Sequence, residues 1–212
     1  MPHDALVIAY QDEDLLALVK PSGLLSVPGR GPENQDSSTS RVQSQFPAAL
    51  PVHRLDMDTS GLLLFALSKA VHRQLSIQFQ ERGVFKRYIA LVAGCPAAAS
   101  GVIELPLICD WPNRPRQKVD FLMGKPSLTH YRVLAIEPGK NASRLALEPL
   151  TGRSHQLRVH LMALGHPILG DPLYAPEGSR QGALRLMLHA EALALPHPVT
   201  GAPLEILAPS PF

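Results

Sequence analysis

Apolar residues occur along this chain in short runs separated by turn-forming residues, and this pattern predicts many short strands. The apolar runs at 6–10 and 15–20 are joined by Gln-Asp-Glu-Asp, which indicates a hairpin. Residues 62–67 form a continuous apolar run that is typical of a buried strand. The other segments with strand-like patterns are 84–93, 128–136, 143–149, 184–188 and 204–207.

Two segments have helical periodicity instead. Apolar residues recur every fourth position between 71 and 79, which predicts a helix over 69–82 that is capped by Ser68 and ended by Gly83. A second helix is expected over 155–164, with Ser154 as its cap and Gly165 at its end. Its leucines at 157, 161 and 164 are expected to face the core.

The remaining segments are expected to be loops. Residues 29–44 are polar and rich in Pro and Gly, so they predict a loop that leads into a short helix. Between 94 and 124, prolines alternate with short apolar runs, which indicates loops and hairpins. Because the helices do not alternate regularly with the strands, the pattern predicts an α+β fold with a mixed or antiparallel sheet.

Composition fits a soluble globular protein that can bury a real core. The 212 residues are 45% hydrophobic and 18% charged, and no apolar run is long enough to span a membrane. Cys95 and Cys109 have neither metal-site nor disulfide spacing, and the N-terminus has no secretory signal, so we expect a cytoplasmic protein. The net charge of +2 does not by itself announce a nucleic-acid partner.

The segment from 51 to 67 contains two aspartates just before the predicted buried strand. Asp56 and Asp58 stand where a loop enters the core, a place that can hold a carboxylate rigidly. Two carboxylates could perform acid–base chemistry on a glycosidic bond. Aspartates beside a turn are also common as simple turn formers, and the spacing leaves both interpretations open.

A second polar cluster lies on the helix predicted at 155–164. His155, Arg158 and Met162 share one face, so Arg158 needs an anionic partner or solvent, and an ion pair with Asp56 is one hypothesis. A zinc site made by His155 and His160 is disfavoured because residues five apart are separated by about 140° around a helix. We favour histidines that are partly buried and hydrogen-bonded by the protein itself.

Two further segments could contact nucleic acid. Tyr88 follows Lys86 and Arg87 on a predicted strand, where it could stack on a base or simply belong to the core. Residues 111–118 combine a tryptophan with cations that include Arg116 and Lys118, which is typical of an RNA-contact loop or of a solvated basic loop. No phosphate-binding glycine loop, nucleophile constellation or cofactor fingerprint is present in the sequence.

Several ordered motifs resemble the RluA-type pseudouridine synthases. HRLDMDTSG at 53–61 is similar to the central motif of that family, and KPSGLLSVPG at 20–29 is similar to its N-terminal motif. The other matching blocks are KRYIALV at 86–92, residues 151–175 and LHAEALALPHP at 188–198. One departure is Val19, where the family usually has Asn, and we expect it to perturb the loop at Lys20 rather than the reaction.

The resemblance implies a pseudouridine synthase catalytic fold, with an extended mixed or antiparallel sheet, flanking helices and a central cleft that holds Asp56. One catalytic domain is expected over 1–212, without an S4-type RNA-binding domain. The reaction breaks the N1–C1′ bond of uridine, rotates the uracil and rejoins it through C5, so the resemblance implies neither cofactor nor metal. The implied partners are structured RNAs, namely a 23S rRNA stem-loop and the tRNA anticodon stem-loop, and we expect a monomer.

The resemblance also implies roles for individual residues. Asp56 corresponds to the essential aspartate, which acts as nucleophile or base, whereas Asp58 falls at a variable position. Tyr88 corresponds to the tyrosine that stacks on the base, and Arg158 to the arginine that pairs with the aspartate. Further implied substrate contacts are Arg54, which replaces the flipped uridine in the stack, and Leu188 as an aliphatic wall. We also predict substrate binding by Lys20, Arg153, His155, Arg116 and Lys118.

Three other functions stay open from the sequence. A paralogue that modifies a single rRNA or tRNA site would share every motif above. A non-catalytic RNA-binding protein would fit a chain that lacked Asp56, Tyr88 or Arg158, but all three are present. A glycoside or nucleoside hydrolase would need the second carboxylate, Asp58.

Overall fold

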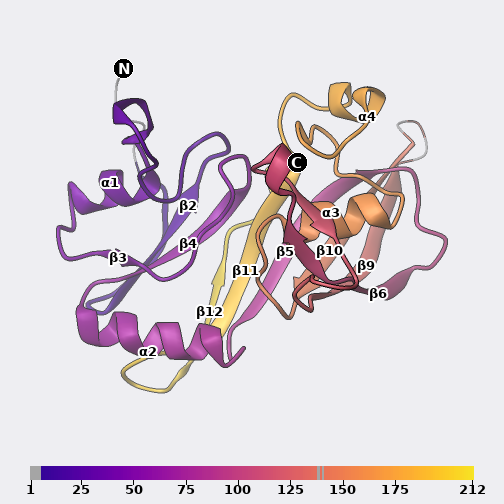
Figure 1. Cartoon of the computed structure of the whole chain (residues 1–212). Coiled ribbons are helices and arrows are strands. Elements are labelled where there is room, and N and C mark those ends of the chain that lie inside the picture. The colour runs from indigo at the N-terminus through magenta and orange to yellow at the C-terminus, as the bar shows by residue number, and fades with distance from the viewer. Residues whose placement is uncertain (1–5, 138, 140) are drawn as a thin grey trace. The chain divides into compact units, whose positions relative to one another are not determined.

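The computed structural model describes residues 6–137, 139 and 141–212 and divides the chain into two compact units. The first unit comprises Met1–Phe85 and Ala190–Pro211, and the second comprises Lys86–His189 and Phe212. In Figure 1 the first unit is drawn from indigo to magenta and again in yellow, and the second from magenta to orange. Each unit has its own hydrophobic core.

The first unit is built on antiparallel pairs around a fully buried strand. β1 (Ile8–Gln11) pairs with β2 (Leu15–Lys20), and β2 pairs with β4 (Ser60–Ala66) from Lys20 opposite Gly61 to Leu15 opposite Ala66. The short β3 (Leu50–Pro51) also pairs with β4, and β12 (Pro203–Leu207) pairs with β11 (Leu188–Pro196). All seven residues of β4 are buried, as its continuous apolar run predicts.

Two helices accompany these strands. α1 (Ser38–Gln43) is capped by Ser37, whose hydroxyl accepts a hydrogen bond from the backbone N–H of Ser40. α2 (Lys69–Gln80) begins after Ser68, which caps the N–H of Val71, and it buries Val71 and Leu75 as predicted. The left-handed residue that ends α2 is Arg82, with φ of 61°, and not the expected Gly83. A single turn of 3-10 helix, Pro32–Asn34, lies in the preceding loop.

The second unit contains a four-stranded part of the sheet in the order β5-β10-β9-β6. These strands span Phe85–Ala93, Ala142–Pro149, Leu128–Glu137 and Ser100–Glu104, and neighbouring strands in this order are antiparallel. The helix α3 (Gln156–Ala163) contributes Leu157 and Leu161 to the core of this unit. The short helix α4 spans Glu177–Gln181.

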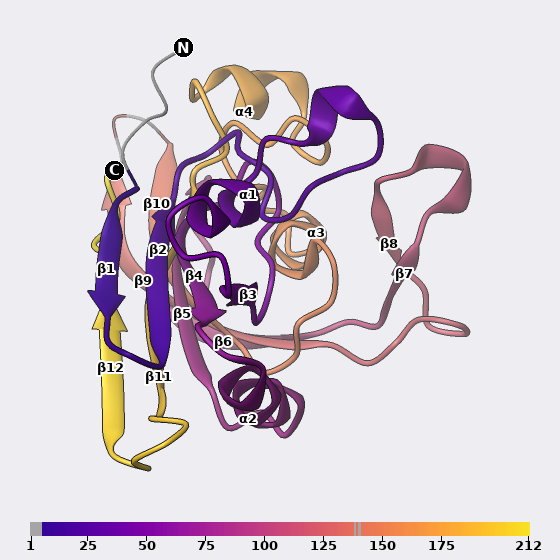
Figure 2. The same ribbon diagram turned by 90° about the vertical axis from the view of Figure 1, so that its left-hand side faces the viewer.

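A separate two-stranded hairpin projects from the second unit. It consists of β7 (Leu107–Cys109) and β8 (Gln117–Val119), joined by a 3-10 turn at Trp111–Asn113. Figure 2 shows this hairpin extending away from α3 and from the strands β5, β6, β9 and β10. Its base is anchored by a small cluster in which Leu107 packs with Val159 and Tyr174.

The α+β class and most elements are confirmed, but two further sequence predictions, besides that for Gly83, are wrong. Residues 184–187 are not a strand, since β11 begins only at Leu188 and the Leu184 side chain is fully exposed. Ser154 does not cap α3; the N-cap residue is His155, in the left-handed conformation with φ of 53°. Both errors come from local patterns that tertiary contacts override, because apolar runs and serines also occur in loops. No helix in the described ranges is long and apolar enough to cross a membrane.

Candidate active site

In the first unit, the candidate site is the loop between β3 and β4 that carries Asp56. Leu55 is buried, Asp56 is half-buried, and Arg54 is exposed. The backbone N–H of Thr59 donates to the Asp56 carbonyl oxygen at 3.1 Å, which closes a tight turn just before the buried strand. The loop therefore holds the backbone of Asp56 against the core while its side chain keeps contact with solvent.

Three side chains from the neighbouring segment at 20–26 hold this turn by hydrogen bonds to its backbone. Lys20 Nζ donates to the carbonyl oxygen of Met57 at 2.7 Å, and Ser22 Oγ donates to that of Asp58 at 2.7 Å. Ser26 Oγ donates to the Leu55 carbonyl oxygen at 2.7 Å and accepts from the Leu55 N–H at 3.0 Å. The residues on both sides of Asp56 are thereby fixed, which is how a rigid loop can present one carboxylate.

Lys20 is the most unusual of these three residues because its side chain is completely buried. Its ammonium group also donates to the carbonyl oxygens of Pro21 and Leu24, at 2.8 and 2.7 Å, so all three of its protons have acceptors. Burial lowers the pKa of Lys20 to about 8, and the nearby negative charges of Asp58 and Asp56 oppose this shift. The structure thus places a positive charge beneath the Asp56 loop.

The 20–26 loop is itself held by α1. The N–H of Ser38 donates to the Leu25 carbonyl oxygen at 2.7 Å, and Thr39 donates to the Ser26 carbonyl oxygen through both its N–H and its hydroxyl. On the other side of the Asp56 loop, Gly61 has φ of 112°, and a Cβ atom there would lie 2.2 Å from the Ala190 carbonyl oxygen. A glycine is therefore required where the loop enters β4.

In the second unit, Arg158 is buried and paired with Asp171. Its Nε donates to Asp171 Oδ2 at 2.8 Å and its Nη2 donates to Oδ1 at 2.7 Å, while the two side chains are 2% and 1% exposed. Asp171 Oδ1 also accepts from the N–H groups of Leu173 and Tyr174. A bidentate pair with these added hydrogen bonds fixes the plane of the guanidinium group.

Tyr174 connects this pair to the projecting hairpin. Its ring lies 5.2 Å from the Arg158 guanidinium carbon, a cation–π distance. Its hydroxyl accepts from the Gln117 N–H at 2.7 Å and lies 2.6 Å from His155 Nδ1. This hydroxyl either donates to Nδ1 or accepts from it, according to the tautomer of His155.

The burial of α3 decides between the two expectations for Arg158, which were an anionic partner or solvent. Every residue from 156 to 161 is buried, so Arg158 does not lie on a solvent-facing side. Leu157 and Leu161 pack into the main core of the unit, while Val159 packs under the hairpin. The prediction that Leu164 also faces the core is wrong, because Leu164 lies past the last helical residue and is exposed. The helical pattern alone does not predict that the Val159 side of α3 is buried, because the hairpin that covers this side comes from a distant part of the sequence.

His160 is fully buried and hydrogen-bonded by the protein, as the favoured interpretation predicts. Its Nε2 lies 3.0 Å from Ser127 Oγ and 3.1 Å from the Leu105 carbonyl oxygen, and its Nδ1 lies 3.0 Å from Thr129 Oγ1. Burial lowers the pKa of His160, which favours the neutral ring. These contacts give His160 a structural role between α3 and β9.

Tyr88 and Leu188 are brought together by the core of the second unit. Leu188 is 3% exposed within this cluster, and Tyr88 is partly buried against it, opposite Leu147 of β10. Arg153 stays exposed, with its Nε donating to the Pro126 carbonyl oxygen at 3.3 Å. Arg153 and His155 flank the N-terminus of α3, next to the Arg158–Asp171 pair in sequence.

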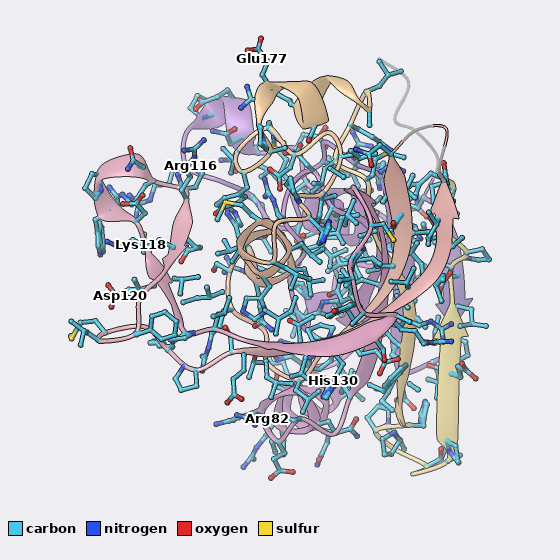
Figure 3. The ribbon with its side chains drawn as sticks, turned by 90° about the vertical axis from the view of Figure 1, so that its right-hand side faces the viewer. Arg82, Arg116, Lys118, Asp120, His130 and Glu177 are labelled. Atoms are coloured by element: carbon cyan, nitrogen blue, oxygen red, sulfur yellow. The ribbon has the colours of Figure 1, made fainter. Side chains whose placement is uncertain are left out.

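The predicted basic loop forms the tip and return strand of the hairpin. Arg114 stacks over Trp111, with its guanidinium carbon 4.5 Å from the ring centroid. Arg116 and Lys118 are exposed, and Figure 3 shows Lys118 on the outer side of the hairpin. The loop thus presents cations and one aromatic ring to solvent, which is a surface suited to a polyanion.

Within the described residues, one group of three side chains has metal-ligand chemistry, namely Asp12, Asp14 and His197 in the first unit. His197 Nδ1 accepts from the N–H groups of Val199 and Thr200, so the proton of a neutral ring lies on Nε2. That Nε2 donates to Asp12 Oδ2 at 3.0 Å. The hydrogen bonds therefore explain this group as a link between two turns.

Sequence reasoning missed Asp171, Tyr174, Ser22 and Ser26. Asp171 and Tyr174 lie inside the block at 151–175 that was recognised as a motif, and Ser22 and Ser26 lie inside the block at 20–29. One signal could have found Asp171, because a buried arginine such as Arg158 needs a carboxylate partner, and Asp171 is an acidic residue of the same block. The serines carried no such signal, because their partners are backbone carbonyl groups of a distant loop.

Comparisons with known proteins agree with these motifs. Residues 14–163 match the family described as RNA pseudouridylate synthase. The chain is 54% identical over 207 residues to the dual-specificity RNA pseudouridine synthase RluA of Escherichia coli K12, covering 98% of this chain and 94% of that protein. Against the protein of the same name from Yersinia pestis, identity is 52% over 98% of this chain and the whole of the relative.

A solved structure supports the same assignment. Human RNA pseudouridylate synthase domain containing 1 has a TM-score of 0.83 and 32% identity, covering 99% of this chain and 85% of that chain. Human RNA pseudouridylate synthase domain containing 4 has a TM-score of 0.77 and 26% identity, covering 96% of this chain and 88% of that chain. The chain therefore belongs to the RNA pseudouridylate synthase family, as an RluA-type enzyme that isomerises uridine to pseudouridine in RNA.

Proposed function

We propose that this enzyme modifies uridine in two RNAs, a 23S rRNA stem-loop and the tRNA anticodon stem-loop at the uridine that opens the anticodon loop. The observation that carries this proposal is 54% identity over nearly the whole chain to an enzyme whose name describes it as dual-specificity. One enzyme can serve two RNAs when it reads a common loop shape and few bases. The proposal includes a monomeric, cytoplasmic enzyme with a single catalytic domain.

Asp56 is proposed to act on the target uridine as nucleophile or base. The loop geometry supports this role, because Lys20, Ser22 and Ser26 fix the backbone around Asp56, a half-buried residue. The reaction detaches uracil from C1′ and forms a bond from C1′ to C5, after which the C5 proton leaves and N1 gains a proton. A carboxylate held in one place can stabilise or attack the developing positive charge at C1′.

Arg158 is proposed to orient the Asp56 carboxylate, as the family resemblance implies. Its support in the structure is the rigid pair with Asp171, which fixes the guanidinium plane before any substrate binds. Tyr88 is proposed to stack on the detached uracil, and Leu188 to provide an aliphatic wall. Both belong to one packed cluster, so their side chains are held in place.

The target uridine has to leave the helix stack before it can react, which costs a few kcal/mol. Arg54 is proposed to occupy the vacated position, and its exposed place beside the Asp56 loop supports this role. Lys20, Arg153, His155, Arg116 and Lys118 are proposed as further contributors to substrate binding. For Lys20 the contribution is indirect, because its ammonium group is buried against three carbonyl oxygens.

Tritium release from RNA labelled at uridine C5 tests this function, with the anticodon stem-loop and the 23S fragment measured in parallel. We expect release from both RNAs by the wild type and a loss of at least a thousandfold in Asp56→Asn, a size consistent with removing a group that acts on the reacting atoms. The matched control is Asp58→Asn, which removes a carboxylate two residues away and is expected to retain release.

The other outcomes separate the alternatives. Release from only one RNA would indicate a single-target paralogue. Free uracil as product, together with inactivity of Asp58→Asn, would identify a hydrolase. Binding of both RNAs without release from either would contradict the dual-target proposal.

A further inference from the structure

The turn at residues 120–124, directly after β8, exposes three consecutive apolar side chains. Phe121, Leu122 and Met123 are 76%, 93% and 73% exposed. Single exposed apolar residues are ordinary, but three adjacent ones on one turn form a patch that typically marks an interaction surface. The candidate site described above does not use any of them.

This turn is rigid, so the exposure of these side chains is built into the backbone. Asp120 Oδ1 accepts from the N–H groups of Leu122 and Met123, at 3.0 and 2.9 Å. These hydrogen bonds are the main reason that the pKa of Asp120 is lowered. Gly124 N–H donates to the Asp120 carbonyl oxygen at 2.9 Å, and a Cβ atom at Gly124 would lie 2.2 Å from that oxygen.

The turn is also anchored to the projecting hairpin. The N–H of Asp120 donates to the Pro106 carbonyl oxygen at 3.0 Å, and Leu107 and Lys125 exchange two backbone hydrogen bonds of 3.0 and 2.8 Å. Figure 3 shows Lys118 and Asp120 following one another along the outer side of this hairpin. The apolar side chains are therefore presented at a fixed place on an element that extends from the second unit.

The charges around the turn indicate which partner it fits. Lys118 precedes the apolar residues, Lys125 follows them, and both are exposed. Arg116 lies further along the same hairpin, so residues 116–125 carry three cationic side chains and one carboxylate, that of Asp120. An apolar patch flanked by cations suits a polyanion that also offers apolar faces, and RNA with unstacked bases has both properties.

We propose that the turn formed by Phe121, Leu122 and Met123 is an RNA-docking wedge. Its side chains pack against unstacked bases of the substrate loop, and Lys118 and Lys125 contact the adjoining phosphates. The contact is tolerant of sequence because every base has an apolar face. This inference rests on the proposed function only in taking RNA as the substrate.

The test is a variant that combines Phe121→Ser, Leu122→Ser and Met123→Ser. Its Kd for the anticodon stem-loop and for the 23S fragment is measured by fluorescence anisotropy over a series of salt concentrations. We expect Kd to rise by about tenfold or more, the equivalent of losing one stacked base, with the same salt dependence as the wild type. Lys118→Gln with Lys125→Gln should instead make the salt dependence shallower, because phosphate contacts are lost.

The matched control replaces three other exposed apolar residues of the same unit, in Val102→Ser, Leu134→Ser and Ile136→Ser. These side chains are 54%, 42% and 54% exposed, and the control is expected to bind RNA with the wild-type Kd. Unchanged Kd in the 121–123 variant, or an equal loss in the control, would overturn the inference. A dimer that becomes a monomer in the 121–123 variant, with unchanged RNA affinity, would also overturn it by identifying a second copy as the occupant.

The tritium assay keeps the two proposals apart. Release by the wild type, combined with unchanged RNA affinity of the 121–123 variant, overturns the wedge alone. Weakened binding in that variant, combined with no tritium release by the wild type, supports the wedge and overturns the proposed function.

Discussion

The loop that carries Asp56 and the helix that carries Arg158 immobilise a charged residue in different ways. Around Asp56, side chains of the neighbouring loop bind backbone carbonyl groups, and the residue is half-buried. Arg158 is held by its own side chain, through a buried bidentate pair with Asp171. The first arrangement fixes the backbone that carries the charged group, and the second fixes the charged group itself.

The difference has an energetic consequence. A buried ion pair is costly to break because either partner alone is left as an uncompensated charge away from water. The side chains that bind the backbone of the Asp56 loop can be replaced one at a time, and each replacement costs a carbonyl group one hydrogen bond. Stability should therefore depend more on the Arg158 pair, and activity more on the Asp56 loop.

The largest effect on stability is expected from Asp171→Asn. This change leaves the buried charge of Arg158 without its counter-charge, which costs about 3–5 kcal/mol in the free energy of unfolding. Urea denaturation followed by far-UV circular dichroism measures the loss. Glu104→Gln, an exposed carboxylate on β6, is the control and should change stability by less than about 0.5 kcal/mol. A loss below about 1 kcal/mol in Asp171→Asn would show that the pair is not essential to the unit.

A pH-dependent effect of about 3 kcal/mol is expected from Lys20. Its folded pKa of about 8 lies below the unfolded value of about 10.4, so the unfolded chain binds more protons between these pH values. The contribution of Lys20 to the free energy of unfolding therefore rises as pH increases through this window. Relative to Lys20→Met, the wild type should gain about 3 kcal/mol between pH 7 and 10.5.

Urea denaturation of both proteins at several pH values measures this difference, since the titration of all other groups is shared. Curves for the two proteins that stay parallel from pH 7 to 10.5 would contradict a lowered pKa for Lys20. The result also decides whether the buried Lys20 ammonium group below the Asp56 loop loses its proton at alkaline pH.

The smallest of these effects is expected from Tyr174→Phe. The ring next to Arg158 is kept, but the hydroxyl that accepts from Gln117 and forms a hydrogen bond with His155 is lost, at a cost of about 1–3 kcal/mol in stability. Because the hydroxyl joins the hairpin to α3, KM for RNA should rise more than kcat falls. Tyr131→Phe, another buried tyrosine of the unit, is the control. Equal changes in the two variants would reduce Tyr174 to an ordinary core residue.

Much of the local structure could be predicted from sequence because it depends on neighbours in the chain. The buried strand at 60–66 follows from an apolar run, and α2 follows from a four-residue periodicity with a serine cap. The candidate residues Asp56, Tyr88 and Arg158 were likewise found in short motifs. Prediction failed at the start of α3, where His155 adopts a left-handed conformation that no local pattern announces.

The sequence by itself determined the fold class, the family and the candidate site residues, since these depend on motifs that are continuous in the chain. Only the tertiary structure decided how those residues are held. Lys20 and Met57 are 37 residues apart, and Tyr174 and Gln117 are 57 apart. Such contacts form because burial leaves polar groups in need of partners, and which distant partner is within reach is settled by the packing of the whole unit.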